Sequence, residues 1–387
     1  MSHSVLDPPR RRVLPEGRPP RPTRERRKHH RVRRLIVGLL LVGLGLSTAS
    51  YVRALTYPGN ATWQQRSVSW VRDHGGSPIV NRAENWYYTR NAPSTAPPNP
   101  AALPTTAAPA ATPAGGPHPL PALSGLPGEG AWVPNRAGTG GQPVAYTTYV
   151  QPDPAHAGVV AGVAWIRAGA TTAHLVAGTT QPGGNGWAGN AQVPPAAVPN
   201  LVAVFNSGFK LNDITGGYYS HRRTAKALRT GQASLVVNDR GAITIGQWGR
   251  DITMNPHIAS VRQNLALVVD HGRAADGLTV NADQRWGSAA NQLQYTWRSG
   301  IGTDTAGNLI YVAGDKMTLA TLAGALVDAG AVTGMQLDIH PGMAFYASWS
   351  PTGAQGAQPR KLLPTMPGAA HRYLAPDQRD FFYLTLH

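Results

Sequence analysis

The sequence predicts an α+β fold: a domain of mostly antiparallel or mixed short strands with a few packed helices, preceded by one transmembrane helix. Three observations favour this class. Short apolar runs separated by turn residues recur through the C-terminal two-thirds of the chain, one strong amphipathic helix interrupts them, and 44 glycines and 34 prolines among 387 residues suit loops and turns. The chain has no cysteine, which excludes disulfides, thiolate metal sites and a cysteine nucleophile.

Positive charge is concentrated at the N-terminus. Of the net charge of +16, residues 1–34 contribute +9, from 12 basic and 3 acidic side chains, whereas residues 122–387 contribute +4, from 18 and 14. A nucleic-acid-binding domain would carry its basic patch on the folded part. We therefore predict no nucleic-acid partner and assign residues 1–34 to a basic cytoplasmic tail.

Residues 35–52 form an uncharged apolar segment directly after this tail. Eighteen helical residues span about 27 Å, enough to cross the hydrocarbon core of a bilayer. The arginines before the segment predict a single-pass protein of the cell membrane with a cytoplasmic N-terminus and an extracytoplasmic C-terminal domain. The alternative is a cleavable signal peptide with Ser47-Thr48-Ala49 as its cleavage site, but the preceding region is long for one. We favour an uncleaved anchor.

Residues 53–91 form a juxtamembrane segment with helical and aromatic character. Asn60 or Thr62 caps a predicted helix that ends at Gly75-Gly76, and a second apolar stretch over 79–88 is rich in aromatic residues. These aromatics either rest on the outer membrane surface or dock on the main domain, and the sequence does not choose between the two. Ten prolines in residues 92–121 then predict an extended linker.

Residues 122–387 are predicted to fold as one strand-rich domain. Polar, glycine-containing turns at 238–241 and 304–307 predict hairpins. Thr318 caps a helix whose apolar stripe runs to Gly330. The predicted strands are Ala145–Gln151, Val159–Ala168, Ala173–Gly178, Leu201–Asn206, Ala233–Asn238, Ala242–Trp248, Asn264–Asp270, Arg298–Thr303, Asn308–Gly314, Gly334–His340, Ala344–Trp349 and Phe381–Leu386.

Two of these strands end by presenting polar side chains. In Gly334–His340 the alternation places Asp338 and His340 together on the face opposite the apolar residues, just before a Pro-Gly turn. The apolar strand 201–206 ends on Asn206, followed by Ser-Gly, which indicates a close approach of backbone or ligand. The structural alternative is that Asn206 caps a turn and Asp338 is a buried, hydrogen-bonded carboxylate.

Three sequence blocks resemble the phosphodiester glycosidase family. The run Val204–Phe209 (VFNSGF) is similar to the family's FNGGFF segment, and Arg298–Asp304 (RSGIGTD) is similar to its RTAIGxD segment. The stretch from Thr318 to Asp338 is similar to the family block that begins with a TL-initiated helix and ends in LDGGGSS. Because the blocks keep the family's order, the domain resembles a divergent bacterial member.

The resemblance weakens at the glycine-rich block. Where the family has Asp-Gly-Gly-Gly-Ser, this chain has Asp338-Ile339-His340-Pro341-Gly342, and Ser207 replaces the second glycine of the first block. Bulkier and stiffer residues thus replace glycines that let a backbone approach a substrate. Either the substrate contacts differ from those of the family, or the domain has lost catalysis and retains binding.

The resemblance implies a reaction, cleavage of a sugar from the phosphate of a sugar-1-phosphodiester in a cell-envelope glycan or exopolysaccharide, with no metal or other cofactor. The leaving group is a stable phosphate anion, so one carboxylate and one phosphate-binding arginine can suffice. We expect catalytic roles for Asp338, Arg298 and His340. The alternative is a non-catalytic glycan-binding or scaffold domain. The expected substrate-binding residues are Asn206, Gly208, Phe209, Ser299 and Gly342.

Overall fold

The computed structural model describes residues 24–104, 115–121, 125–281, 283–289, 291–351 and 357–387, with the side chains of residues 24–31 and 351 excluded. The chain forms two compact units that divide between Thr56 and Tyr57. Most of the predicted basic tail lies outside the described residues. The unit boundary falls within the expected juxtamembrane segment, so residues 57–91 belong to the same unit as the strands.

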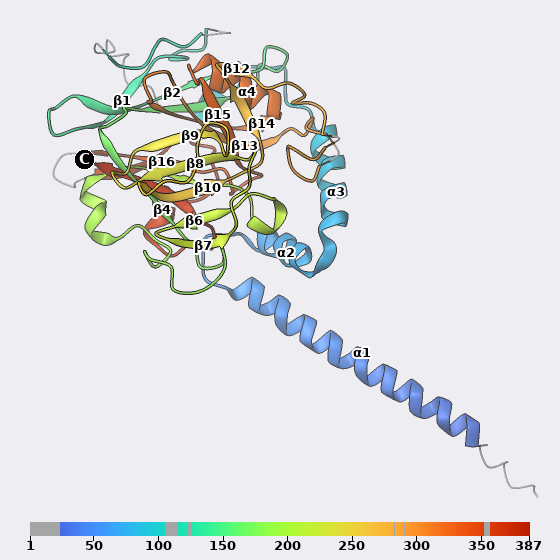
Figure 1. The fold of residues 1–387 in the computed structure, drawn as a ribbon. Coiled ribbons are helices and arrows are strands. Elements are labelled where there is room, and N and C mark those ends of the chain that lie inside the picture. Colours follow the sequence, from blue (N-terminus) through green and yellow to red (C-terminus); the bar gives the residue numbers. More distant parts are fainter. Residues whose placement is uncertain (1–23, 105–114, 122–124, 282, 290, 352–356) are drawn as a thin grey trace, which may run out of the picture. The chain divides into compact units, whose positions relative to one another are not determined.

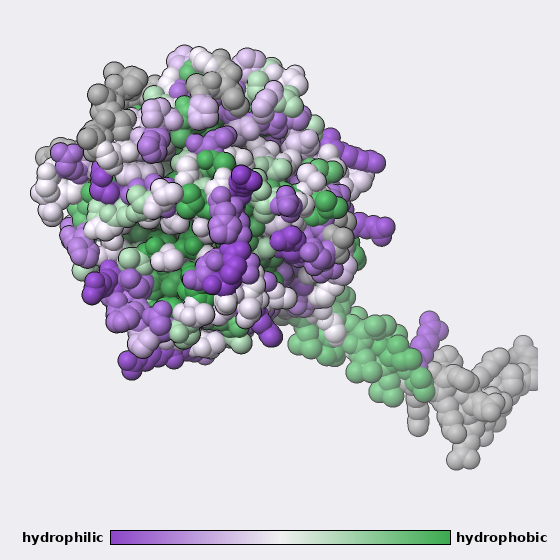
Figure 2. Space-filling model, turned by 45° about the horizontal axis from the view of Figure 1, so that its top comes forward, coloured by the Kyte–Doolittle hydropathy of each residue, from purple (hydrophilic) through white to green (hydrophobic). Residues whose placement is uncertain are grey.

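In its described residues, the first unit consists of the helix α1 (Arg24–Thr56). Its part from Val32 to Thr56, 25 residues, is long and apolar enough to cross a membrane, and none of it is buried. Figure 2 shows its side chains as a continuous hydrophobic surface. Length and composition therefore suit the predicted membrane span, and a signal sequence near an N-terminus has the same properties.

The second unit is built on three antiparallel sheets, which confirms the predicted α+β class (Figure 1). The largest, in spatial order, comprises β1 (Val133–Ala137), β2 (Pro143–Val150), β3 (Ala161–Ile166), β14 (Leu309–Met317), β13 (Thr296–Thr303), β15 (Thr333–Ile339), β11 (Leu267–Asp270) and β12 (Arg273–Ala274). The second comprises β7 (Arg223–Lys226), β6 (Tyr218–Ser220), β10 (Ile258–Gln263), β8 (Ala233–Asn238) and β9 (Ile243–Gln247). The third comprises β17 (Ala357–Lys361), β16 (Tyr346–Pro351), β5 (Leu201–Asn206), β18 (Phe381–Leu386) and β4 (Thr171–Val176).

The eight-stranded sheet is buried on both faces. One face contributes Met335 and Leu337 to the main apolar core, which it shares with strands of the other two sheets. The other face packs against α4 (Leu319–Asp328), the predicted amphipathic helix, which Thr318 caps as expected. All eight residues of β13 are buried, so this central strand and its neighbour β15 form a rigid base for the residues at their ends.

Two further helices belong to the second unit. Thr62 caps α2 (Trp63–Val71) through a capping box with Gln65, and a short π-helical turn, Arg72–Gly76, connects it to α3 (Ser77–Arg90). Neither α2 nor α3 has a fully buried residue. They therefore lie on the surface of the unit, and they are fixed there by the polar contacts described below.

Candidate functional site

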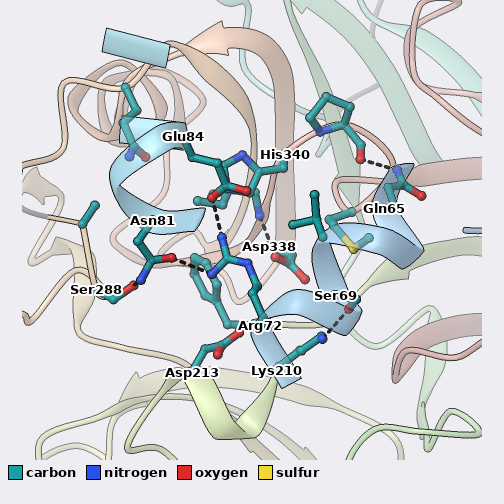
Figure 3. Close-up of a pocket in the computed structure, with 18 of the residues that line it drawn as sticks. Gln65, Ser69, Arg72, Asn81, Glu84, Lys210, Asp213, Ser288, Asp338 and His340 are labelled. Atoms are coloured by element: carbon teal, nitrogen blue, oxygen red, sulfur yellow. Dashed lines mark hydrogen bonds and ion pairs between the residues drawn. The ribbon is translucent and has the colours of Figure 1, made fainter. Parts of the chain in front are cut away.

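A cavity of about 500 Å³ lies between the helices α2 and α3 and the end of β15 (Figure 3). The two helices and their cap form one wall, and β15 with its following turn brings Asp338 and His340 to the other side. The lining residues lie within 62–88, 209–214, 286–289, 292–294 and 338–343, together with Pro367 and Arg379.

Asp338 is the buried carboxylate of the cavity. Its Oδ2 accepts a hydrogen bond from Arg379 Nη2 at 2.7 Å, and its Oδ1 accepts one from the backbone N–H of Ile339 at 2.8 Å. Arg379 also donates to the carbonyl of Gly208 at 2.9 Å. Burial raises the pKa of Asp338 above its ordinary value, although the positive charge of Arg379 opposes this rise. The site thus holds a carboxylate whose ionised form is only partly compensated.

His340 follows Asp338 at the point where β15 turns away. Its φ of 77° lies in the left-handed region, which a glycine adopts without strain and a histidine does not. The ring is held on three sides: Nδ1 lies 3.1 Å from Thr296 Oγ1, Nε2 lies 3.4 Å from a carboxylate oxygen of Glu84, and the ring stacks on Tyr88 with centroids 5.1 Å apart. The histidine therefore takes a conformation that its neighbours on α3 help to fix.

Three cations surround the cavity, and each is paired with a carboxylate. Arg379 pairs with Asp338, and Arg72 pairs with Glu84 while donating to Asn81 Oδ1 at 2.6 Å. Lys210 lies 3.3 Å from a carboxylate oxygen of Asp73 and donates to Ser69 Oγ. The side chain of Asp73 is 58% exposed, so the pairing of Lys210 is the weakest of the three.

Arg298 lies behind the cavity wall. It is fully buried, and its guanidinium donates to the carbonyl of Met317 at 2.9 Å, to Gln292 Oε1 at 3.3 Å and to the carbonyl of Gln294 at 3.4 Å. Burial lowers its pKa to about 9, which still leaves the group protonated at neutral pH. Both glutamines line the cavity. Arg298 therefore supports the wall from behind, and the guanidinium groups that line the cavity are those of Arg72 and Arg379.

Asn206 and Ser299 form a buried chain of hydrogen bonds that ends at Asp338. Asn206 Nδ2 donates to Ser299 Oγ at 3.0 Å, and Ser299 Oγ donates to the backbone carbonyl of Asp338 at 2.9 Å. Asn206 Oδ1 accepts from Tyr311 OH and from the backbone N–H of Phe345. These two predicted binding residues thus hold the end of β15 in place.

The remaining predicted binding residues lie at the cavity or border it. Phe209 lines it, and Gly208 supplies the carbonyl that accepts from Arg379. A Cβ at Gly208 would approach the Asn264 side chain to 2.9 Å, so the close packing requires glycine there. Gly342 has a φ of 77°, and Gln65 of α2 fills the space where its side chain would lie.

A charge-balanced cluster underlies the site. Besides the pair of Asp338 with Arg379, Arg262 binds Asp380 at 2.8 Å and Arg372 binds Asp377 at 2.7 Å. Three arginines thus face three aspartates, and three of the six come from the run 377–380 immediately before β18. Because β18 pairs with β5, this run is brought beside the Ser207–Gly208 turn.

Sequence reasoning missed Arg379, Lys210, Arg72 and Glu84. The unusual run Asp-Gln-Arg-Asp at 377–380, directly before an apolar strand, was the available signal for Arg379. The other three lie in segments whose docking only the structure reveals. Within the described parts of the chain, no group of three or more side chains suited to a metal ion occurs.

Comparisons with known proteins find likenesses of fold. No family model and no curated protein matches the chain. Among solved structures, the catalytic domain of zebrafish N-acetylglucosamine-1-phosphodiester alpha-N-acetylglucosaminidase, auto-inhibited by its pro-peptide, is 15% identical with a TM-score of 0.40, over 65% of this chain and 86% of that one. A hypothetical protein from Synechocystis is 14% identical with a TM-score of 0.41, over 63% and 62%. An exported protein from Burkholderia pseudomallei is 12% identical with a TM-score of 0.30, over 59% and 74%. These values indicate a distant relationship of fold at most.

Proposed function

We propose that this chain is a membrane-anchored, extracytoplasmic hydrolase that cleaves sugar-1-phosphodiester linkages in cell-envelope or exopolysaccharide glycans. The observation that carries the proposal is the placement of Asp338. It is a buried carboxylate with a raised pKa, paired with an arginine, in a cavity large enough for a sugar phosphate. This combination is typical of catalytic sites. A buried carboxylate of this kind lowers the stability of the protein, and in a site without a catalytic role nothing offsets that loss.

The residues of the cavity divide the reaction between them. Arg379 offers a planar guanidinium fork to the phosphate, the role first expected of Arg298, and Lys210 adds a second positive charge. When the phosphate binds Arg379, Asp338 is released from its ion pair, and its carboxylate either forms a bond to the sugar carbon, from which water later displaces it, or removes a proton from the water molecule that attacks that carbon. The carbon–oxygen bond to phosphate then breaks, and the phosphate monoester leaves with the electron pair. The phosphate monoester needs no proton in order to leave, and His340 is placed to exchange a proton with water.

The α2–α3 helices form part of the site in this proposal. The cavity is present while both helices are docked, so a ligand need not displace them. Tyr88, Phe209 and Trp286 bring aromatic side chains to the same lining, which suits stacking on a sugar ring. The helices therefore act as a wall that limits the size of the bound glycan.

The test is hydrolysis of synthetic sugar-1-phosphodiesters by the purified full-length protein in detergent. We expect release of free sugar and phosphate monoester by the wild type, with loss of release in Asp338→Asn. Absence of turnover on a panel of anomers and sugars, together with saturable binding of the same compounds, would instead support a glycan-binding domain.

One observation favours that alternative. Gln65 Nε2 donates to the carbonyl of Pro341 at 2.6 Å and occupies the space beside Gly342, so the turn after Asp338 is closed by protein. In a catalytic site of the expected family type, glycines would leave this backbone open to substrate. Gln65→Ala reopens the turn and distinguishes the two: turnover that rises in this variant places Gln65 at the edge of a working site.

The anchoring part of the proposal rests on α1. We propose that the span Val32–Thr56 stays uncleaved, with the arginine-rich tail inside the cell and the second unit outside. Protease added to intact cells should then digest the second unit and leave a small membrane fragment. Recovery of a soluble protein that begins near Ser50 from the culture medium would show cleavage instead.

A further inference from the structure

Helix α3 directs several polar side chains toward the protein, together with Tyr88, and directs large apolar side chains and two arginines away from it. On the inner face, Asn81 Nδ2 donates to Ser288 Oγ at 2.9 Å, Asn85 Oδ1 accepts from Gln294 Nε2 at 3.1 Å, and Glu84 contacts His340. A surface helix of a globular protein ordinarily buries its apolar side and exposes its polar side. In α3, by contrast, the largest exposed side chains are apolar or aromatic and most of the contacts with the protein are polar.

The outer face carries large hydrophobic side chains that are more than half exposed to solvent. Ile79 is 77% exposed, Trp86 58% and Tyr87 52%. The exposed positions follow the helical repeat i, i+3, i+4, i+7, i+8, i+11, so they form one continuous stripe along the helix. Figure 1 shows α3 on the outer side of the strand-rich unit. The stripe consists of Ile79, Arg82, Ala83, Trp86, Tyr87 and Arg90.

The composition of this stripe matches the surface of a lipid bilayer. Tryptophan and tyrosine concentrate at the boundary between headgroups and acyl chains, and arginine binds anionic headgroups. The guanidinium of Arg90 lies 5.1 Å from the centre of the Trp86 ring, so charge and aromatic surface are presented together. None of the six residues is acidic.

The position of the stripe in the chain favours the same partner. Only residues 57–62 separate the end of α1 from the start of α2. A second copy of the chain fits less well. A twofold contact through this stripe would bring Arg82 and Arg90 of one copy close to the two arginines of the other copy. The positive charge of the stripe is thus complementary to an anionic membrane, whereas the stripes of two copies would repel each other.

We propose that the outer face of α3 lies in the headgroup region of the membrane that α1 crosses, while the inner face of α3 forms a wall of the cavity. This inference rests on the proposed anchoring by α1. It places the cavity beside the membrane surface, and so selects substrates that lie close to that surface, such as sugar phosphates attached to membrane components.

The absence of cysteine allows a direct test with single fluorescent labels. Ala83→Cys places a label in the middle of the stripe. The matched control is Ala306→Cys in the exposed turn after β13. The start of β13 lies beside α3, since Tyr295 donates its backbone N–H to the carbonyl of Tyr88. The turn at the other end of β13 is therefore a strand length away from α3. The labelled full-length proteins are reconstituted into vesicles of phosphatidylcholine and phosphatidylglycerol that contain a lipid with a nitroxide near the headgroup.

We expect quenching at position 83 to exceed that at position 306 several-fold, and to fall in pure phosphatidylcholine. Ile79→Glu with Trp86→Glu should remove the difference while the thermal transition of the protein is retained. Equal quenching at both positions overturns the proposal. A blue shift of the label's fluorescence at position 83 that depends on protein concentration and persists in detergent also overturns it, because it would indicate that a second copy covers the stripe. Co-flotation with vesicles after a carbonate wash tests α1 separately: quenching at position 83 without stable flotation would refute the anchor and leave the α3 surface in place.

Discussion

The ion pairs of Asp338 and Asp380 have similar geometry but lie in different surroundings. Both aspartates bind an arginine within 2.8 Å, but Asp380 and Arg262 are each 1% exposed, whereas Asp338 and Arg379 border the cavity. Burial raises the pKa of Asp338, so the folded state binds a proton more readily than the unfolded chain does. Its contribution to the free energy of unfolding therefore falls as the pH rises above the ordinary value of 3.8.

We predict that Asp338→Asn abolishes turnover with little loss of stability. Asparagine avoids the cost of a buried charge and can still accept from Ile339, and Arg379 keeps its bond to Gly208, so the free energy of unfolding should change by about 1 kcal/mol or less. Turnover should fall about a hundred-fold or more, since the carboxylate is the reacting group. Denaturant unfolding and sugar release measured on the same preparations check both statements.

The matched control is Asp380→Asn. Removing this charge strands Arg262 in the interior and should cost about 3–5 kcal/mol. If Asp338→Asn is the more destabilising of the two and retains specific activity at low temperature, Asp338 is a structural residue and the proposed function fails.

We predict that the two arginines respond differently to replacement by lysine. Arg379→Lys keeps the charge and loses the fork, so it should weaken binding of phosphodiester substrates about ten-fold and leave neutral sugars nearly unaffected. Arg298→Lys cannot reach all three of its acceptors and should lower stability by about 2–3 kcal/mol. Binding constants for a phosphodiester and for its neutral sugar, measured for each variant, separate the two roles. Equal weakening of both ligands in Arg379→Lys would contradict the assignment.

At this scale the sequence identified some of the residues that line the candidate site. Asp338 and His340 were predictable as polar residues at the end of an apolar strand. The strict alternation that predicted a shared face for them is interrupted by a register shift opposite Arg298 and by the left-handed backbone of His340. Arg379 was not, because its position beside Asp338 depends on the pairing of β18 with β5, two strands far apart in the chain. Arg298 lies in a strand buried on all sides, and a single strand does not show that both of its faces are covered.

At the scale of elements, α3 is a case in which the sequence pattern predicted an element but not how it docks. The sequence indicated an apolar stretch and left its docking open. In the structure Tyr88 stacks on His340, so the helix docks on the main domain, while Trp86 and Tyr87 are exposed. β10 (Ile258–Gln263) was missed for a related reason. Its buried Arg262 and Gln263 give it a polar composition, and their partners come from distant segments.

We predict that Glu84 controls the docking of α3. Burial opposes its ionisation, but the hydrogen bond and charge of His340, with those of Arg72, outweigh this and lower the pKa of Glu84. The resulting stabilisation is present above the ordinary value of 4.5 and is lost as the pH falls below it. Glu84→Gln should therefore increase hydrogen exchange in residues 77–90 at neutral pH, by an amount that decreases on acidification.

The control on the same helix is Arg82→Gln, which changes an exposed charge of the outer face. Measured in detergent, this variant should leave hydrogen exchange in residues 77–90 unchanged. An equal increase in both variants would mean that the helix responds to any loss of charge, and that the contact between Glu84 and His340 does not hold it.

At the scale of the whole molecule, the apolar core and the cavity wall have different origins. The buried residues of the two main clusters begin at Leu120, and α2 and α3 contribute none of them. Composition and turn signals were enough to predict the strand-rich domain because its core is continuous from there to the C-terminus. The wall is held by polar contacts between segments far apart in the chain, which leave no periodic signal in the sequence.

The last prediction follows from this division. A fragment of residues 116–387 retains Leu120 and the His118 carbonyl that accepts from Trp132, so it should unfold in one cooperative transition. Compared with a fragment of residues 57–387, it loses the part-buried polar contacts of Asn60 and Asn85 and the packing of Leu103 at the edge of the core, but none of the buried core residues. Its stability should fall by about 1–3 kcal/mol with nearly the same denaturant dependence. It should also lose turnover, because the wall that closes the cavity is gone. Guanidinium unfolding and sugar release of both fragments provide the measurement. An aggregated short fragment beside a folded long one would show that α2 and α3 belong to the core, and a short fragment with raised turnover would show that they block the site.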